Sequence, residues 1–158
     1  MAHSSEKKFL VDGMLGSIAR KLRILGFDTV YDLQLDDHEL LEKARDSGRI
    51  LLTSDNELFY RAKRNYTASI RVNSKTEIGR LYEVLSGVGE NRINLTSITS
   101  RCSACNGELF DSEKSLGERT VLVCRRCGKN YWRGGHWKKL TKVFSEVNQM
   151  LGDRKEAK

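Results

Sequence analysis

Short apolar runs alternate with segments of helical periodicity along the first hundred residues. The runs are typical of strands, and they cover residues 8–11, 27–31, 50–53 and 69–72. The segment after the first run carries apolar side chains at helical spacing, at Met14, Leu15, Ile18, Leu22 and Leu25. Similar segments follow the other runs. This alternation predicts the α/β fold class, with a largely parallel sheet and flanking helices.

The ends of these elements carry residues that start or stop helices. Gly26 suits the end of the first helix, because glycine tolerates the left-handed backbone found there. The acidic stretch from Asp36 to Glu39 suits the start of the second helix, where the helix dipole favours negative charge. Ser74, with Glu77 three residues later, predicts a capping box at the start of the fourth helix.

The chain changes character after about residue 86, where glycine, asparagine, serine and threonine accumulate up to residue 101. We expect an α/β domain at residues 7–90 and a smaller C-terminal part at residues 91–151. The smaller part ends in a predicted amphipathic helix, and its apolar stripe comprises Trp137, Leu140, Phe144, Val147 and Leu151. We expect this stripe to pack on the α/β domain rather than on a partner.

Four cysteines form two Cys-x-x-Cys pairs, Cys102 with Cys105 and Cys124 with Cys127, separated by 18 residues. This arrangement is typical of structural zinc, because two thiolates three positions apart on a tight turn reach one tetrahedral ion. Gly128 lets the backbone turn beneath the metal. Four thiolates leave no position for water, so such an ion is structural and not catalytic. A thiol redox role is the alternative, but it rarely uses two such pairs at this spacing.

Composition bears on where the protein works. The chain is 39% hydrophobic and 31% charged, as in globular proteins. No apolar run approaches the ~20 residues needed to cross a bilayer. The polar N-terminus lacks the apolar region of a secretory signal. We therefore expect a cytoplasmic protein without membrane contact, in which reduced cysteines are available to metal.

Positive charge is concentrated in the C-terminal third. Residues 101–158 hold 13 Lys and Arg against 7 Asp and Glu, a net charge of +6 out of +7 for the whole chain. Four thiolates around one Zn²⁺ offset part of this charge. A basic cluster of this kind favours a phosphate-rich partner such as RNA. The alternative is a solvated basic surface with no partner.

Three aspartates follow strands or begin helices on what the α/β pattern predicts to be one edge of the sheet. Asp12 directly follows the first strand, Asp37 begins the second helix, and Asp55 follows the third strand by two residues. Ligands of open parallel sheets bind beyond the carboxyl ends of the strands. Converging carboxylates repel one another unless a cation joins them, and hard oxygen ligands favour Mg²⁺ or Mn²⁺. The alternative is that these residues, Asp37 in particular, only cap helices.

Six sequence segments together resemble one known family. They are FLVDGMLG at 9–16, ARKLRILGFDT at 19–29, DHELLEKA at 37–44, GRILLTSD at 48–55, RCSACNG at 101–107 and CGKNYWRGGHW at 127–137. With these motifs the chain resembles the PIN-like family named for the C-terminal RNase domain of Mut-type exonucleases, over nearly its whole length. The resemblance implies a PIN-like domain followed by a zinc ribbon, and a metal-dependent endoribonuclease activity.

In this resemblance Asp12, Asp37 and Asp55 fall on the acidic positions of the family. PIN nucleases often have a fourth acidic residue, for which Asp36 and Glu39 are the candidates here. The family usually has arginine after the threonine of its Thr-x-Asp motif, whereas this chain has Ser54.

Aromatic and basic residues surround the second cysteine pair and continue into the C-terminal helix. Aromatic faces stack on unpaired bases, and Arg and Lys hold phosphates. The expected RNA contacts are Arg20, Lys21, Arg125, Arg126, Lys129, Trp132, Arg133, Trp137 and Lys138. Alternatively, Trp132 and Trp137 pack the ribbon against the larger domain. We interpret His136 as a structural histidine.

Two functions are compatible with these patterns. The first is an endoribonuclease that depends on Mg²⁺ or Mn²⁺, with Asp12, Asp37 and Asp55 as catalytic metal ligands and a structural zinc ribbon that binds RNA. The second is a non-catalytic protein that binds RNA, rRNA or the ribosome with the same fold. Both require the same basic surface, so the sequence does not separate them.

Overall fold

The computed structural model describes residues 7–94, 100–116 and 119–156. Its first part is a parallel sheet in the order β2-β1-β3-β4. The strands are β1 (Lys8–Val11), β2 (Asp28–Tyr31), β3 (Ile50–Thr53) and β4 (Ser69–Arg71). Leu10 of β1 pairs with Val30 on one side and with Leu51 on the other. The predicted parallel sheet is confirmed.

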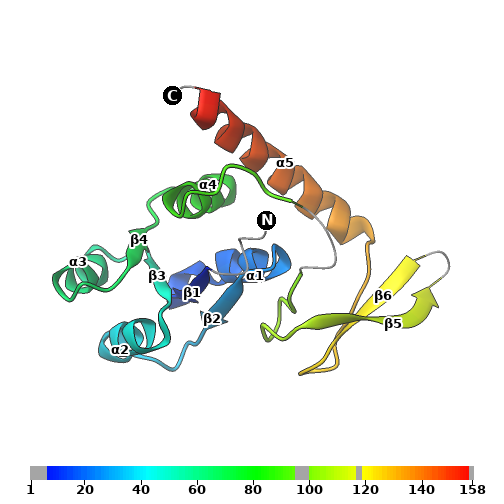
Figure 1. The fold of residues 1–158 in the computed structure, drawn as a ribbon, viewed down its shortest axis with the longest axis horizontal. Coiled ribbons are helices and arrows are strands. Elements are labelled where there is room, and N and C mark those ends of the chain that lie inside the picture. Colours follow the sequence, from blue (N-terminus) through cyan, green and yellow to red (C-terminus); the bar gives the residue numbers. More distant parts are fainter. Residues whose placement is uncertain (1–6, 95–99, 117–118, 157–158) are drawn as a thin grey trace.

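Helices cover both faces of this sheet (Figure 1). α1 (Gly16–Ile24), α4 (Glu77–Gly87) and α5 (Gly135–Glu156) share one core, and α2 (Asp37–Ser47) and α3 (Asn56–Arg64) share another. Successive side chains of a strand point to opposite faces, so β1 contributes to both cores. Phe9 and Val11 enter the first core, Leu10 enters the second, and all three are fully buried.

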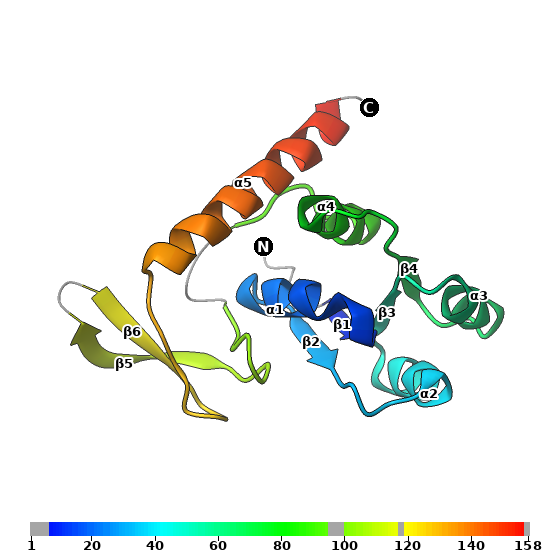
Figure 2. The same cartoon turned by 180° about the vertical axis from the view of Figure 1, so that it is seen from behind.

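The C-terminal helix α5 belongs to the core of the α/β domain. Its residues Leu140, Phe144, Val147 and Leu151 are buried in the core that also contains the apolar side of α4. Figures 1 and 2 both show α5 running beside α4. The expected packing of this stripe on the domain is confirmed. In the described part of the chain, no helix is long and apolar enough to cross a membrane.

The cysteine-containing part forms an antiparallel sheet in the order β5-β6-β7. Its strands are β5 (Leu109–Leu116), β6 (Arg119–Cys124) and β7 (Asn130–Tyr131). Leu109 pairs with Cys124 in this sheet. The hairpin therefore brings the turn before β5, which holds the first cysteine pair, next to the turn after β6, which holds the second.

Two local predictions were wrong. The cap of α4 is Thr76, whose hydroxyl accepts a hydrogen bond from Gly79 N at 3.0 Å, whereas Ser74 Oγ accepts from Thr76 N in the preceding turn. The helix therefore begins two residues later than a cap at Ser74 requires. Met14 lies in a short 3-10 turn, η2 (Gly13–Leu15), and its side chain is 77% exposed. That turn rotates Met14 away from the apolar face on which Leu15 lies.

Candidate functional site

The three aspartates stand where the chain leaves the carboxyl ends of neighbouring strands. Asp12 directly follows β1, and Asp55 follows β3 by two residues. Asp37 is the first residue of α2, after the loop that leaves β2. Because β2, β1 and β3 are adjacent and parallel, all three aspartates belong to one edge of the sheet.

A buried threonine joins Asp12 to Asp55. Thr53 is fully buried, and its hydroxyl donates to Asp12 Oδ2 at 2.8 Å while accepting from Asp55 N at 3.0 Å. Asp12 Oδ1 accepts from Gly13 N at 2.7 Å. These bonds fix the Asp12 carboxylate at the end of β1. The contact of Thr53 with Asp12 was not predicted, because the two residues lie 41 positions apart, at the ends of separate strands.

The capping alternative applies to two of the three aspartates. Asp55 caps α3, since its carboxylate accepts from Leu58 N at 3.2 Å, and Asp12 caps the 3-10 turn. At α2 the cap is Asp36, which forms a reciprocal capping box with Glu39. The side chain of Asp37 is therefore not needed as a cap, while Asp36 and Glu39, the candidates for a fourth acid, are engaged in capping.

The three aspartates interact electrostatically. Partial burial raises the pKa of Asp37, and the negative charges of Asp55 and Asp12 raise it further. Arg61 opposes this shift, with its guanidinium Nη1 3.9 Å from Asp37 Oδ2. The side chain of Asp37 is 49% exposed, so solvent weakens these interactions without cancelling them. A cation beside Asp37 would relieve this repulsion.

The carboxylates do not all approach one point. In the described ranges, the four cysteines form the one group of three or more candidate ligands whose ligand atoms all lie within 4.8 Å of one another. Asp12, Asp37 and Asp55 do not form a group of this kind in those ranges. Asp12 is held by two hydrogen bonds and Asp55 by its capping bond from Leu58 N, whereas Asp37 is exposed and its side chain is not used as a cap.

The cysteine sulfurs have the spacing that a tetrahedral ion requires. The Sγ atoms of Cys102 and Cys127 are 3.6 Å apart, and those of Cys105 and Cys124 are 3.4 Å apart. Four ligands at a Zn–S distance of about 2.3 Å lie roughly 3.8 Å from one another. A Cβ at Gly107 would come within 2.7 Å of Cys124 Sγ, so this close packing requires glycine. The four cysteines can bind a metal such as zinc.

Backbone amides favour the thiolate form of Cys124, which is the form that binds a metal. Burial alone would raise the pKa of Cys124, but hydrogen bonds from the amides of Cys127 and Arg126 outweigh it and lower the pKa to about 6. Cys102 Sγ lies 2.9 Å from the hydroxyl of Tyr131. Tyr131 was not predicted as part of the site, although it belongs to a motif that the family resemblance used.

The expected RNA-binding residues differ in how strongly contacts within the protein restrain their side chains. Lys21 is the most restricted, with its ammonium 2.7 Å from Glu77 Oε1 and its side chain 14% exposed. Arg126 donates to Cys105 O at 3.0 Å, which ties it to the cysteine turn. Arg20 and Lys138 are exposed.

Three further basic residues lie over aromatic rings in and near the ribbon. Arg125 lies 4.7 Å from the ring centre of Phe110, and Lys129 lies 5.4 Å from that of Tyr131. The guanidinium of Arg133 lies 4.8 Å from the ring centre of Trp137. These contacts orient the side chains without neutralising their charges.

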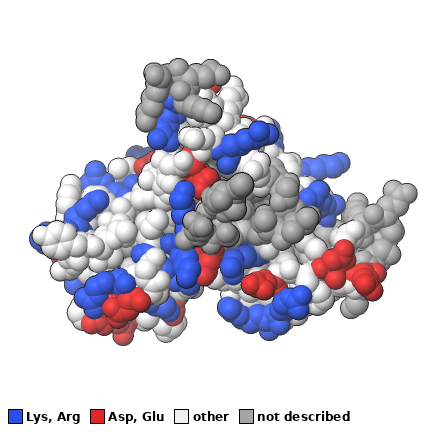
Figure 3. All heavy atoms as spheres, viewed as in Figure 1, with Lys and Arg blue, Asp and Glu red and all other residues white. Residues whose placement is uncertain are grey.

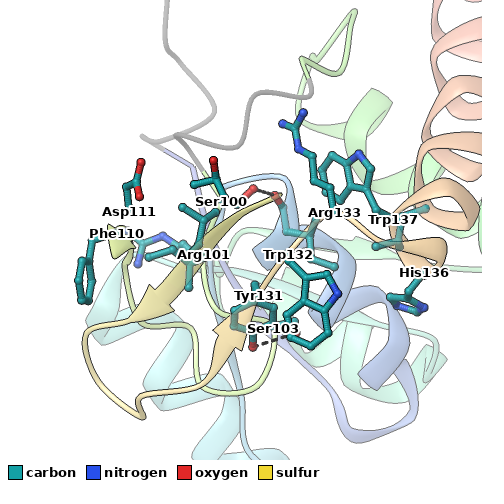
Figure 4. A pocket seen from close by; sticks show the side chains of 15 residues that line it. Ser100, Arg101, Ser103, Phe110, Asp111, Tyr131, Trp132, Arg133, His136 and Trp137 are labelled. Atoms are coloured by element: carbon teal, nitrogen blue, oxygen red, sulfur yellow. Dashed lines mark hydrogen bonds between the residues drawn. The ribbon is translucent and has the colours of Figure 1, made fainter. Parts of the chain in front are cut away.

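A groove of about 700 Å³ lies between the ribbon and the adjoining ends of α1 and α5. Figure 4 shows Arg101, Phe110 and Asp111 on one side of it and Arg133, His136 and Trp137 on the other. The indole of Trp132 is 49% exposed, whereas Trp137 is half-buried and packs against the domain core. His136 is exposed at the groove rather than enclosed in the ribbon.

Figure 3 shows the charges on one face of the molecule. Blue side chains gather over the ribbon and over the α/β domain, and red side chains lie among them. On this face the positive side chains are therefore divided into small patches.

One family model matches the chain. It is described as the Mut7-C RNAse domain, and it matches residues 7–144. The match includes the acidic edge of the sheet, all four cysteines and every residue that lines the groove. No curated protein and no solved structure matches the chain.

Proposed function

Because this chain belongs to the Mut7-C RNAse domain family, we propose that it is a ribonuclease that depends on Mg²⁺ or Mn²⁺ and cleaves RNA at the acidic edge of its parallel sheet. The observation that carries the proposal is the arrangement of Asp12, Asp37 and Asp55 on that edge, where partial burial and then the charges of the other two raise the pKa of Asp37. Carboxylates that together bind a cation are expected to repel one another in the protein without the cation.

The donor chemistry fits a hard divalent cation. Carboxylate oxygens are the ligands that Mg²⁺ and Mn²⁺ prefer, and Asp12, Asp37 and Asp55 would hold the ion. Asp12 is the fixed ligand, because Thr53 and Gly13 N hold its carboxylate. Asp37 is exposed and could rotate towards the ion from the start of α2, and Asp55, which is also exposed, would offer the ion the carboxylate oxygen that does not cap α3.

The residues of the edge have separate tasks in this proposal. A bound Mg²⁺ or Mn²⁺ supplies an acidified water and neutralises charge on the scissile phosphate. Thr53 keeps the Asp12 carboxylate from turning away. Arg61, close to Asp37, and the exposed Arg20 would hold the RNA backbone beside the acids.

The ribbon has the supporting role. We propose that Cys102, Cys105, Cys124 and Cys127 bind one structural Zn²⁺. Arg125, Arg126, Lys129, Arg133 and Lys138 would then add positive charge for RNA, together with the groove beside them. Binding of this kind weakens steeply with salt, because phosphate contacts release counterions.

The test is cleavage of a single-stranded RNA by zinc-loaded protein in a titration with Mg²⁺ or Mn²⁺. We expect cleavage to depend on the added ion and to be absent with Ca²⁺ alone. If the protein binds RNA but cleaves none in any of these ions, the function is non-catalytic RNA binding, the second function considered from the sequence.

A further inference from the structure

The groove between the ribbon and the α/β domain has the properties of a site for an unpaired nucleotide. We propose that it binds one exposed base of the RNA, with Trp132 as the stacking surface and Arg133 and Arg101 as phosphate contacts. This inference rests on the proposed function in one respect, namely that the partner is RNA.

The shape and lining of the groove fit a base. Its volume of about 700 Å³ lies within the range of roughly 300–1,000 Å³ typical of small-molecule sites. Leu109, Phe110 and Leu122 of the ribbon give the groove apolar lining, and Trp132, which also lines it, is 49% exposed. Base–aromatic stacking uses a flat ring that remains accessible in the free protein.

The charge of the groove favours a phosphate-bearing occupant. Arg101 and Arg133 line it, and Asp111 is the one acidic residue in its described lining. Within the described ranges, neither arginine forms an ion pair, although Arg101 Nη1 donates to Asn106 O at 3.1 Å. Arg133 is instead held against Trp137, which orients its guanidinium without neutralising its charge, whereas the indole of Trp132 points to the other side of the strand, towards Tyr131 (Figure 4). An apolar peptide would leave these two charges unsatisfied.

The groove is separate from the acidic edge. Ile24, at the end of α1, lines the groove, while the start of α1 at Gly16 follows Asp12 through the 3-10 turn. The length of α1 alone separates these ends by about 12 Å. Trp132 therefore anchors the RNA away from the bond to be cleaved, and its loss should raise KM for RNA and leave kcat unchanged.

The groove should select unpaired RNA, because a base within a duplex cannot enter it without unstacking. The sharpest experiment compares wild-type protein with Trp132→Ala, Trp132→Phe and Tyr66→Ala in the Asp12→Asn background, where RNA is not consumed. Tyr66 is the matched control, since it is 98% exposed and follows the end of α3, away from the groove. The probes are a single-stranded uridine oligonucleotide and a blunt RNA hairpin.

We expect Trp132→Ala to weaken binding of the single strand roughly five- to a hundredfold, as for loss of one base stack. Trp132→Phe should recover part of that loss, and Tyr66→Ala should bind as the background protein does. A Trp137→Phe variant leaves Trp132 as the one tryptophan, and the single strand should quench its fluorescence more than the hairpin does.

Unchanged affinity in Trp132→Ala, or absence of binding by the background protein at low salt, would overturn the inference. Failure of the nuclease proposal gives a different pattern, in which wild-type protein cleaves no RNA while the Trp132 effect on binding persists.

Discussion

The side-chain oxygen of Asn106 accepts a hydrogen bond from the backbone N–H of Thr29 at 2.9 Å, which joins the ribbon to the edge strand of the parallel sheet. The amide nitrogen of Asn106 also donates to Asp28 Oδ1 at 2.7 Å. Burial alone would raise the pKa of Asp28, but hydrogen bonds from Arg49 and Asn106 outweigh it and lower the pKa. Asn106 thus occupies positions that a further strand would otherwise fill, and it protects the edge of β2.

Replacing Asn106 should therefore destabilise the α/β domain. Asn106→Gly leaves the N–H of the buried Thr29 without its acceptor, at a cost of about 1–3 kcal/mol. Asn106→Ala should cost more, because the backbone at this position has φ 72°, which glycine tolerates and alanine does not. Urea unfolding of both variants measures the difference. Equal stability of wild type and Asn106→Gly would contradict the proposed role of this contact.

Zinc binding and the stability of the α/β domain should be coupled through Asn106. We expect one Zn²⁺ per chain in protein purified without added metal, and loss of zinc in Cys105→Ser. Since Asn106 directly follows Cys105, removal of zinc should loosen its bonds to Thr29 and Asp28.

A double-mutant cycle tests this coupling. Chelation should lower the stability of the wild type more than that of Asn106→Gly, in which the coupling residue is already lost. Equal losses of stability in the two proteins would show that Asn106 does not couple zinc binding to the stability of the sheet. Substoichiometric zinc with disulfide-bonded cysteines would exclude the zinc site itself.

Tyr131 should strengthen zinc binding without touching the ion. Burial, together with its hydrogen bond to Cys102, raises the pKa of Tyr131 to about 12, so the hydroxyl stays protonated and donates to the sulfur at neutral pH. Loss of such a supporting bond typically costs 10–100-fold in metal affinity, and we expect about tenfold for Tyr131→Phe. Competition with a chromophoric zinc chelator measures the zinc affinities of wild type and Tyr131→Phe. Tyr66→Phe, which removes an exposed hydroxyl elsewhere, should leave the affinity unchanged.

Asp37 should destabilise the free protein at neutral pH. Its pKa is raised in the folded state, so stability is lost as pH rises from the ordinary aspartate value through the raised one. Asp37→Asn should therefore unfold at a higher temperature than wild type at pH 7. The exposure of the side chain limits the gain to less than about 1 kcal/mol. The difference should vanish below about pH 4, where the wild-type carboxyl is protonated.

Glu42→Gln is the matched control for Asp37, because Glu42 is an exposed carboxylate on the same helix that contacts only His38 among the described ion pairs. It should not reproduce the pH-dependent gain. Added Mg²⁺ should raise the melting temperature of wild type and of Glu42→Gln more than that of Asp37→Asn. A melting temperature of Asp37→Asn at or below that of wild type at pH 7 would argue against repulsion at the acidic edge.

Much of this architecture could be predicted because it depends on local spacing. The alternation of apolar runs and helical periodicity is sufficient for the sheet and its helices, and the two Cys-x-x-Cys pairs are sufficient for the ribbon. The contacts of Thr53, Asn106 and Tyr131 could not be predicted in the same way, because their partners lie 41, 77 and 29 residues away. Only the folded chain brings those groups together.

The local errors have a related cause. Ser74 and Thr76 both suit a helix cap, and the choice depends on where the chain leaves β4, which the pattern of a single helix does not determine. The basic character of Lys21 predicts a phosphate contact and this stays a prediction, but the sequence did not indicate that Glu77 from α4 lies against Lys21 in the fold. Tertiary neighbours thus decide which of several chemically suitable side chains remain free.

The central claim is that Asp12 and its neighbours form the centre that cleaves RNA. The most direct measurement compares the cleavage rates of wild type, Asp12→Asn and Glu42→Gln, all zinc-loaded, on the same single-stranded RNA in saturating Mn²⁺. Asparagine still caps the turn that Asp12 caps, so the fold should persist, but the charge that holds the ion is lost. We predict that the cleavage rate of Asp12→Asn falls to the background of the assay, while Glu42→Gln cleaves at the rate of wild type. Equal rates for wild type and Asp12→Asn would contradict the account.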